Sequence, residues 1–303
     1  MSRVTAARAY DEFGLFHENA AEAGLPFDRP PVVARRAVEV APGRRLSALV
    51  WGEPEPELVL LHGGAQNAHT WDTVALALDR PLVAIDLPGH GHSDWRADQA
   101  YWPTENAADV AIAIRELAPA ARAVVGMSLG GLTSIALGVR ARELVPRLVL
   151  VDVTPGVDRE KAAAITAFVA GPESFPSFDA ILERTVQFNP TRTVSSLRRG
   201  VLHNAVERPD GSWSWRYDRF RLADGTAVPD FGALWDDVSR LTMPLMLVRG
   251  ADSPVVDDAD VAELRRRQPG VRVEVVEGAG HSVQGDRPVE LAHLIESLLT
   301  PEP

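Results

Sequence analysis

The sequence predicts an α/β protein built on a mostly parallel sheet that helices cover on both faces. Several short apolar runs have no polar interruption, which is typical of strands buried on both faces of a parallel sheet. Helical patterns separate most of these runs, and such alternation favours parallel pairing with helices on both sides. Two strand-like runs near the N-terminus are joined by Pro42-Gly43, a turn signal that predicts an antiparallel hairpin at the entrance to the sheet.

The predicted elements follow the chain in a regular order. Residues 1–31 form a lead-in with helical character around residues 6–23, and the hairpin strands span residues 34–40 and 46–51. The buried strands are predicted at residues 58–61, 82–85, 123–125, 148–151, 245–248 and 271–276. The helices are predicted at residues 71–78, 104–117, 129–140, 257–267 and 288–299, with Thr104 able to cap its helix and Pro288 suited to a first turn.

Residues 154–240 interrupt this alternation. They contain apolar helical stretches, several prolines and no buried-strand run. We interpret them as a helical cap or lid inserted between two parts of the core, residues 32–153 and residues 241–303. The insertion is also rich in aromatic side chains, which either line an apolar pocket or pack the cap onto the sheet: Phe168, Phe175, Phe178, Phe188, Trp213, Trp215 and Tyr217.

Composition excludes several function classes. The 303 residues are 46% hydrophobic and can bury a large core, while the net charge of −11 argues against a nucleic-acid partner, which needs a basic face. The absence of cysteine removes disulfides, thiolate metal sites and a cysteine nucleophile. No stretch approaches the ~18 apolar residues of a membrane span, and residues 1–14 have no apolar run typical of a signal peptide. We expect a soluble, cytoplasmic protein that acts on a small molecule, and the sequence leaves a homodimer open.

The segment from Gly126 to Gly131 carries the main chemical signal. Its sequence, Gly-Met-Ser-Leu-Gly-Gly, lies between a strand-like run and a helical pattern. A serine on such a strand–turn–helix is typical of the Gly-x-Ser-x-Gly nucleophile elbow, which exposes a hydroxyl at the edge of the sheet. The alternative is a Gly-rich turn with an incidental serine. We therefore take Ser128 as the candidate nucleophile.

A serine nucleophile needs a base and a carboxylate that orients it. His281, in a Gly-rich loop just after the last strand run, is the candidate base. Asp252, directly after the run at residues 245–248, is the favoured acid because of its chain order and loop position. Asp152, after the run at residues 148–151, is the alternative, and an Asp before Ser-Pro is also ordinary turn chemistry.

An oxyanion also needs hydrogen-bond donors. The candidates are the backbone N–H groups of Gly64, in the His62-Gly63-Gly64 turn, and of Leu129, which begins the helix after the serine. His62 itself is interpreted as a structural hydrogen-bonding residue, and Gln66, Asn67 and His69 are candidates to line the same edge.

The segment from Asp86 to Ser93 places Asp86, His90 and His92 close together. Metal ligands this near on a Pro/Gly turn usually need further donors from elsewhere. We interpret the segment as a structural turn and expect neither a metal nor a cofactor.

With these motifs in place, the chain resembles the α/β-hydrolase superfamily over residues 35–300. The matching parts are His62-Gly63-Gly64, the segment 86–93, the serine turn at 126–131, Asp252 and Gly280-His281, in the family's order of serine, acid and histidine. The resemblance implies an eight-stranded sheet, a helical cap after the sixth strand, and Ser128, Asp252 and His281 as a triad. The chain departs from the family in one respect. Many relatives have Gly-x-x-Asp at the acid, whereas Gly250-Ala251-Asp252 is one residue shorter, which keeps Asp152 open.

The resulting prediction is a carboxylesterase-like serine hydrolase that cleaves an ester of a small, fairly apolar substrate through an acyl-enzyme. A serine nucleophile disfavours dehalogenase and epoxide hydrolase chemistry, which need a carboxylate. Lactonase, thioesterase, amidase, C–C bond hydrolase and cofactor-free perhydrolase remain open, as does a slow or non-catalytic receptor on the same fold. A nucleotide-binding oxidoreductase is disfavoured because no Gly-x-Gly-x-x-Gly follows the first strand.

Overall fold

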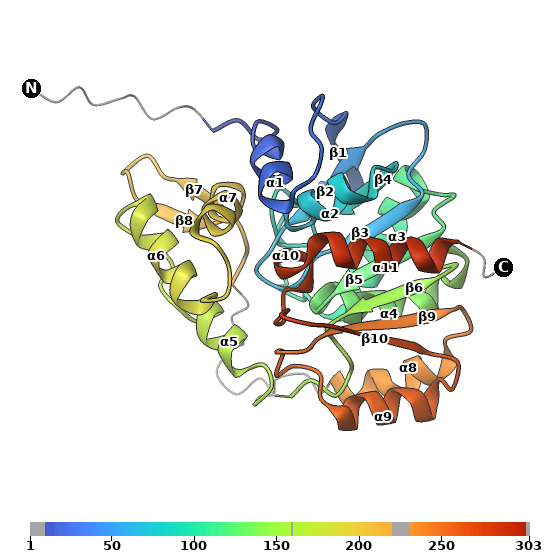
Figure 1. The fold of residues 1–303 in the computed structure, drawn as a ribbon. Helices are drawn as coiled ribbons and strands as arrows, with labels where there is room; N and C mark the ends of the chain where they lie inside the picture. Colours follow the sequence, from blue (N-terminus) through green and yellow to red (C-terminus); the bar gives the residue numbers. More distant parts are fainter. Residues whose placement is uncertain (1–9, 159, 220–230, 301–303) are drawn as a thin grey trace, which may run out of the picture.

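The computed structural model describes residues 10–158, 160–219 and 231–300, which fold around one eight-stranded sheet (Figure 1). The strand order is β1-β2-β4-β3-β5-β6-β9-β10. The strands are β1 (Val33–Ala41), β2 (Arg44–Trp51), β3 (Leu58–Leu61), β4 (Leu82–Ile85), β5 (Ala123–Met127), β6 (Leu148–Val151), β9 (Leu245–Gly250) and β10 (Arg272–Val276). β2 pairs antiparallel with β1 and β4, and the other pairs are parallel. The predicted mostly parallel sheet with an entry hairpin is confirmed.

Helices cover both faces of the sheet, and each face has its own apolar cluster. Val59 and Leu61 of β3 face one cluster, while Leu58 and Leu60 face the other. This arrangement explains why the strand reads as an uninterrupted apolar run. The first cluster contains residues of α3 (Pro103–Leu117), α4 (Leu129–Arg140), α8 (Leu234–Arg240) and α9 (Asp258–Arg267). The second contains residues of α1 (Phe16–Ala23), α2 (Asp72–Leu78) and α11 (Pro288–Leu299).

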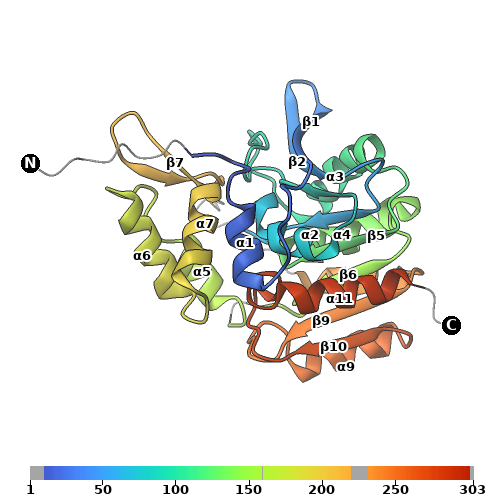
Figure 2. The same cartoon turned by 45° about the horizontal axis from the view of Figure 1, so that its top comes forward.

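A second layer, formed by residues between β6 and β9, stands apart from the sheet (Figures 1 and 2). Its elements are α5 (Ala163–Val169), α6 (Phe178–Phe188), α7 (Val194–Asn204) and a small hairpin of β7 (Ala205–Glu207) and β8 (Trp213–Trp215). Phe175, Ile181, Val201 and Trp215 belong to a separate buried cluster within this layer. We refer to these elements as the cap.

The predicted insertion at residues 154–240 differs from the observed cap at its C-terminal end. η3 (Phe231–Ala233) and α8 lie within that range, yet Leu234 and Val238 of α8 pack in the core cluster beside α4. The C-terminal boundary of the insertion was predicted from the next buried-strand run, at residues 245–248. Because α8 directly precedes that strand, the run does not indicate that this helix belongs to the core. Residue 159 and residues 220–230 of the predicted insertion lie outside the described residues.

The predicted lead-in helix is shorter in the structure. α1 begins at Phe16, after a turn in which the Gly14 N–H donates to the Asp11 carbonyl oxygen, and ends at a left-handed Gly24. Residues 1–9 of the lead-in and residues 301–303 of the predicted core lie outside the described residues. Of the helices in the described ranges, none combines the length and apolar character that crossing a bilayer requires.

Candidate active site

Ser128 lies on the turn between β5 and α4, as the strand–turn–helix pattern predicts. Its backbone is strained, with φ 50° and ψ −118°. A non-glycine residue with positive φ is uncommon and costs free energy, so the surrounding packing must hold this conformation. A Cβ on Gly126 would lie 2.4 Å from the Gly130 carbonyl oxygen, and one on Gly130 would lie 2.3 Å from the Leu61 carbonyl oxygen. Only glycine lets the strand and helix approach this closely around the serine.

His281 follows β10, in a loop fixed by a hydrogen bond from the Gly280 N–H to Asp286 Oδ2 (2.9 Å). Its Nδ1 lies 2.8 Å from Asp152 Oδ2. The Asp152 side chain is fully buried, whereas 18% of the imidazole side chain is exposed. Because Nδ1 donates to a carboxylate, the neutral ring carries its proton there and leaves Nε2 as the proton acceptor.

Asp152 directly follows β6 and, like Ser128, has a positive φ of 50°. Its Oδ1 accepts from the Gly250 N–H (3.0 Å), and its Oδ2 accepts from Ser253 Oγ (2.5 Å) as well as from His281. The carboxylate is therefore held by the ends of two neighbouring strands, β6 and β9. Three donors satisfy a buried charge that would be costly without partners.

The preference for Asp252 as the partner of His281 is corrected by this geometry. Asp252 lies on the turn after β9, where its N–H donates to the Ala279 carbonyl oxygen (3.0 Å) and its side chain is exposed. It lines the cavity described below, and among the described residues no hydrogen bond or ion pair joins its carboxylate to the imidazole. The alternative candidate, Asp152, contacts the imidazole instead, and the turn after β9 places the Ser253 hydroxyl against the same carboxylate.

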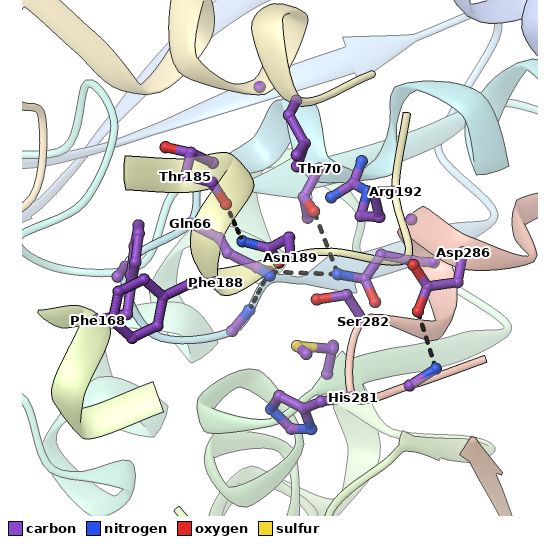
Figure 3. Close-up of a pocket in the computed structure, with 18 of the residues that line it drawn as sticks. Gln66, Thr70, Phe168, Thr185, Phe188, Asn189, Arg192, His281, Ser282 and Asp286 are labelled. Carbon is purple, nitrogen blue, oxygen red and sulfur yellow. Dashed lines mark hydrogen bonds between the residues drawn. The ribbon is translucent and has the colours of Figure 1, made fainter. Parts of the chain in front are cut away.

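Ser128 and His281 line one cavity of about 480 Å³ between the sheet and the cap. Within the described ranges, no hydrogen bond joins Ser128 Oγ to the imidazole; such bonds are often long before substrate binds. Apolar side chains from the cap, Phe168, Phe188 and Trp215, form one wall. Figure 3 shows Phe168 and Phe188 on the side of the cavity opposite Arg192 and Asp286. Of the other predicted cap aromatics, Phe175, Phe178, Trp213 and Tyr217 pack within the cap cluster.

The turn after β3 brings Gly64 into the cavity wall. The neighbouring Gly63 N–H is occupied by Gln66 Oε1 (3.1 Å). Two buried histidines fix this turn. His62 donates from Nδ1 to the Gly63 carbonyl oxygen and accepts at Nε2 from the Leu87 N–H, and His90 accepts at Nε2 from the Ala65 N–H.

Burial lowers the pKa of both histidines, that of His62 to about 3, so each stays neutral as its acceptor role requires. The structural role predicted for His62 is confirmed. Leu129 begins α4 directly after Ser128, and the first N–H groups of a helix have no partner within the helix.

The segment after β4 is a structural turn centred on Asp86. Its buried carboxylate accepts from the N–H groups of Ala68 (2.7 Å) and His92 (3.0 Å) and from Arg35 Nη1 (2.8 Å). Although burial raises the pKa of Asp86, the Arg35 charge and the hydrogen bonds from the Ala68 and His92 N–H groups together outweigh it, and the net shift is downward. Asp86 is therefore an ionised hydrogen-bonding centre, in agreement with the structural interpretation of this turn.

His69, Asp72 and His203 form the group whose ligand atoms could most readily hold a metal ion, since these atoms lie within 4.8 Å of one another. The geometry favours a hydrogen-bonded network instead. The two imidazole rings stack with centroids 3.7 Å apart and planes 11° apart, so no ion can lie in both ring planes. His69 Nδ1 contacts Asp72 (2.9 Å) and its Nε2 contacts Glu12 (3.1 Å). The network joins α7 of the cap to the core.

Asn67 and Asn204 reinforce this junction between cap and core. Asn67 caps η1 (Ala68–Trp71) and donates to the His203 carbonyl oxygen (3.1 Å), while Asn204 donates to the Ala65 carbonyl oxygen (2.7 Å). Asn67 and His69, which were predicted to line the site edge, lie in the cavity wall. Their side chains are already engaged in the hydrogen bonds between the cap and the core.

Comparison with known proteins agrees with this architecture. The sequence model that describes the alpha/beta hydrolase family matches residues 58–294 of this chain. The chain belongs to the alpha/beta hydrolase family. Its matched range contains the serine turn, the cap and His281.

Its relatives within the alpha/beta hydrolase family include enzymes named for ester cleavage. Esterase Rv0045c of Mycobacterium tuberculosis is 48% identical over 296 residues, covering 95% of this chain and 96% of that protein. Its crystal structure matches this fold with a TM-score of 0.85 at 47% identity, covering 97% of this chain and 99% of that one. The sn-1-specific diacylglycerol lipase ABHD11 of Mus musculus is 28% identical over 255 residues, covering 80% and 81% of the two chains.

Two features of the site were missed by sequence reasoning. Ser253 was considered only as part of a turn, although its hydroxyl supports Asp152. Arg192 was not considered, although it lines the cavity from the segment between α6 and α7. The Gly-x-x-Ser spacing from Gly250 could have indicated Ser253, since it places a hydroxyl where many relatives have the acid. No local signal distinguishes Arg192 from the other cap arginines.

Proposed function

We propose that this alpha/beta hydrolase cleaves carboxylic esters of small molecules through a Ser128–His281–Asp152 triad. The observation that carries the proposal is the hydrogen bond from His281 Nδ1 to buried Asp152, with Ser128 on a strained turn in the wall of the same cavity. The relationship to an esterase over nearly the whole chain supports the same reaction class.

In the proposed mechanism, His281 Nε2 takes the Ser128 Oγ proton as Oγ attacks the ester carbonyl carbon. The N–H groups of Gly64 and Leu129 stabilise the negative charge on the carbonyl oxygen. The tetrahedral intermediate expels the alcohol, which receives the proton from His281, and an acyl-enzyme remains. Water then loses a proton to His281, attacks the acyl carbon, and releases the acid and free Ser128. Asp152 stays ionised and stabilises the imidazolium in both steps.

The cavity supports a substrate of modest size. A volume of about 480 Å³ lies within the range of small-molecule sites, and the Phe168, Phe188 and Trp215 wall suits an apolar group. A lactone or thioester can undergo the same acyl transfer. We favour oxygen esters because of the named activity of the 48% identical relative.

Active-site labelling tests the proposal. A fluorophosphonate probe should label the wild-type protein and fail to label Ser128→Ala. Ser282→Ala is the matched control, because this serine also lines the cavity but lies outside the elbow. Hydrolysis of p-nitrophenyl esters of increasing chain length should be lost in parallel in Ser128→Ala. A wild-type protein that takes no label, or equal labelling of Ser128→Ala, contradicts the acyl-enzyme mechanism.

A further inference from the structure

Arg192 presents a positive charge to the cavity, and within the described part of the chain it forms no ion pair with a carboxylate. It lies between α6 and α7 and lines the same cavity as Ser128 and His281 (Figure 3). Its Nη2 donates to Ser196 Oγ (2.5 Å), while its buried Nε has no hydrogen-bond partner. Among the described residues, no Asp or Glu oxygen lies within 4.0 Å of its guanidinium nitrogens.

The acids nearest to Arg192 are already engaged. Asp286, whose charge acts on Arg192, accepts a hydrogen bond from the Gly280 N–H (2.9 Å) and so supports the His281 loop. Glu22, the other acid that acts on it, pairs with Arg199 on α7. Both carboxylates are thus held by other donors, and among the described residues neither lies within ion-pair distance of the guanidinium.

The guanidinium is also held in place. A Cβ on Gly285 would lie 2.8 Å from Arg192 Cζ, so the glycine backbone of α10 (Val283–Asp286) packs directly against the group. The bond to Ser196, in the first turn of α7, fixes its other side. An anion that enters the cavity therefore meets a donor that is already positioned, which reduces the entropy lost on binding.

Three other partly buried arginines pair with acids. Arg35 pairs with Glu12 and Asp86, Arg44 pairs with Asp109, and Arg199 pairs with Glu22. Arg192 differs from them, and its burial lowers its pKa from the ordinary value. A desolvated cation without a counter-ion is costly, and a bound anion would offset that cost.

We propose that Arg192 binds a carboxylate carried by the substrate, so that the preferred esters are half-esters of short dicarboxylic acids. The inference rests on the proposed ester hydrolysis and names the substrate class for it. The free carboxylate lies against Arg192 at the polar end of the cavity, and the ester carbonyl reaches Ser128. The planar guanidinium offers two N–H donors in the geometry that a carboxylate accepts.

The polar end contains further groups suited to such a ligand. Thr70 and the buried Gln284 line the cavity beside Arg192, and Gln284 Nε2 donates to Thr70 Oγ1 (3.2 Å). Because Thr70 Oγ1 accepts from Gln284, its own hydroxyl hydrogen can be donated to a carboxylate oxygen. The apolar wall lies across the cavity and can take the remainder of the substrate. The two ends thus match a molecule with one charged and one apolar end.

A matched pair of esters tests the proposal. Monomethyl glutarate carries the carboxylate, and methyl glutaramate has nearly the same shape without the charge. The wild-type kcat/KM, followed by methanol release, should be about 10- to 100-fold higher for the half-ester, as expected for a charged hydrogen-bonded contact. Arg192→Gln should remove this preference by lowering only the half-ester value. Arg192→Lys, which keeps the charge but not the planar pair of donors, should be intermediate.

The control is Arg198→Gln, the same change at an exposed residue of α7 outside the cavity wall, and it should keep the wild-type preference. Equal wild-type kcat/KM for the two esters overturns the proposal, as does an equal loss of both in an Arg192→Gln protein of unchanged Tm.

Binding of glutarate to Ser128→Ala, measured by calorimetry, separates this proposal from the proposed reaction because it needs no catalysis. Glutarate should bind Ser128→Ala more tightly than glutaramide does, and adding Arg192→Gln should abolish the difference. Equal binding of the two ligands refutes the carboxylate site even if ester hydrolysis is established. A glutarate preference in Ser128→Ala, together with a wild-type protein that takes no fluorophosphonate label, supports the site and refutes the reaction.

Discussion

Asp152→Asn and Asp252→Asn together distinguish the two candidate acids. Asp152 Oδ2 accepts from both His281 Nδ1 (2.8 Å) and Ser253 Oγ (2.5 Å), and Oδ1 accepts from the Gly250 N–H (3.0 Å). An asparagine of almost the same shape keeps its oxygen toward Gly250. Its NH2 group then faces His281, and two donors cannot share that contact. The imidazole responds by moving its proton to Nε2, where it can no longer accept the Ser128 proton.

The loss of the correct tautomer sets the magnitude. We expect kcat of Asp152→Asn to fall by about 10³- to 10⁴-fold, as in other serine triads. This corresponds to about 4 to 5.5 kcal/mol of transition-state stabilisation. KM should change little, because the buried carboxylate does not face the substrate. Asp252→Asn should stay within about threefold of wild type, since its exposed side chain makes no contact with His281.

The assay is steady-state hydrolysis of p-nitrophenyl butyrate, with Tm measured for each variant to confirm folding. The fluorophosphonate labelling rate should fall in Asp152→Asn in parallel with kcat, because both steps need the activated hydroxyl. A larger loss of kcat in Asp252→Asn than in Asp152→Asn would refute the structural assignment. So would an Asp152→Asn enzyme that retains more than a tenth of wild-type kcat.

Two further predictions concern stability. Burial lowers the pKa of His69, but the contacts with Asp72 and Glu12 outweigh burial and raise this pKa to about 9. The imidazolium therefore stabilises the fold fully below pH 6.5, and this stabilisation is lost as the pH rises toward 9. The shift corresponds to roughly 3 kcal/mol, and thermal denaturation should show a Tm that falls between pH 6.5 and 9 in wild type but not in His69→Gln; a flat wild-type profile contradicts the assignment. Gly130→Ala should prevent stable folding, because the new Cβ would lie 2.3 Å from the Leu61 carbonyl oxygen. In the control Gly200→Ala, in α7, the new Cβ would meet no atom within 4 Å, and the free energy of unfolding should rise by about 0.5–1 kcal/mol. Equal Tm values for these two variants would show that the close approach at the serine turn is not needed.

The sheet and the serine turn could be predicted from sequence because their signals are local. A strand buried on both faces must be apolar along its whole length, as Leu58–Leu61 is, and this pattern requires no knowledge of its neighbours. The glycines around Ser128 reflect a steric limit within a few residues of it. Constraints of this kind can therefore be recognised within a short segment of the sequence.

The acid could not be settled in the same way. Asp152 and Asp252 both follow strands, and these strands, β6 and β9, are neighbours in the sheet. Which carboxylate reaches His281 depends on the left-handed backbone of Asp152 and on the path of the turn after β9. Neither is encoded in the residue type, since aspartate is an ordinary turn residue in extended as well as left-handed conformations.

Contacts between segments far apart in the chain could not be predicted from the sequence either. The network around His69 joins Glu12 of the lead-in and His203 of the cap. Arg192 reaches the cavity only because the cap folds back over the sheet. The periodicity of a strand or helix does not predict which distant segments contact one another. The residues of the cap that line the cavity can therefore be identified only from the structure.

The turn after β9 brings Ser253 against Asp152, the carboxylate that His281 contacts. The third residue after Gly250 is Ser253, whose hydroxyl donates to Asp152 (2.5 Å). The turn after β9 therefore supplies a hydrogen-bond donor to a carboxylate that follows the neighbouring strand, β6. Because the Gly250 N–H contacts the same carboxylate, the end of β9 orients the imidazole through Asp152. Both Ser128 and Asp152 have a positive φ on turns that follow the adjacent strands β5 and β6, so the packing of this strand pair fixes both the serine and the carboxylate that His281 contacts.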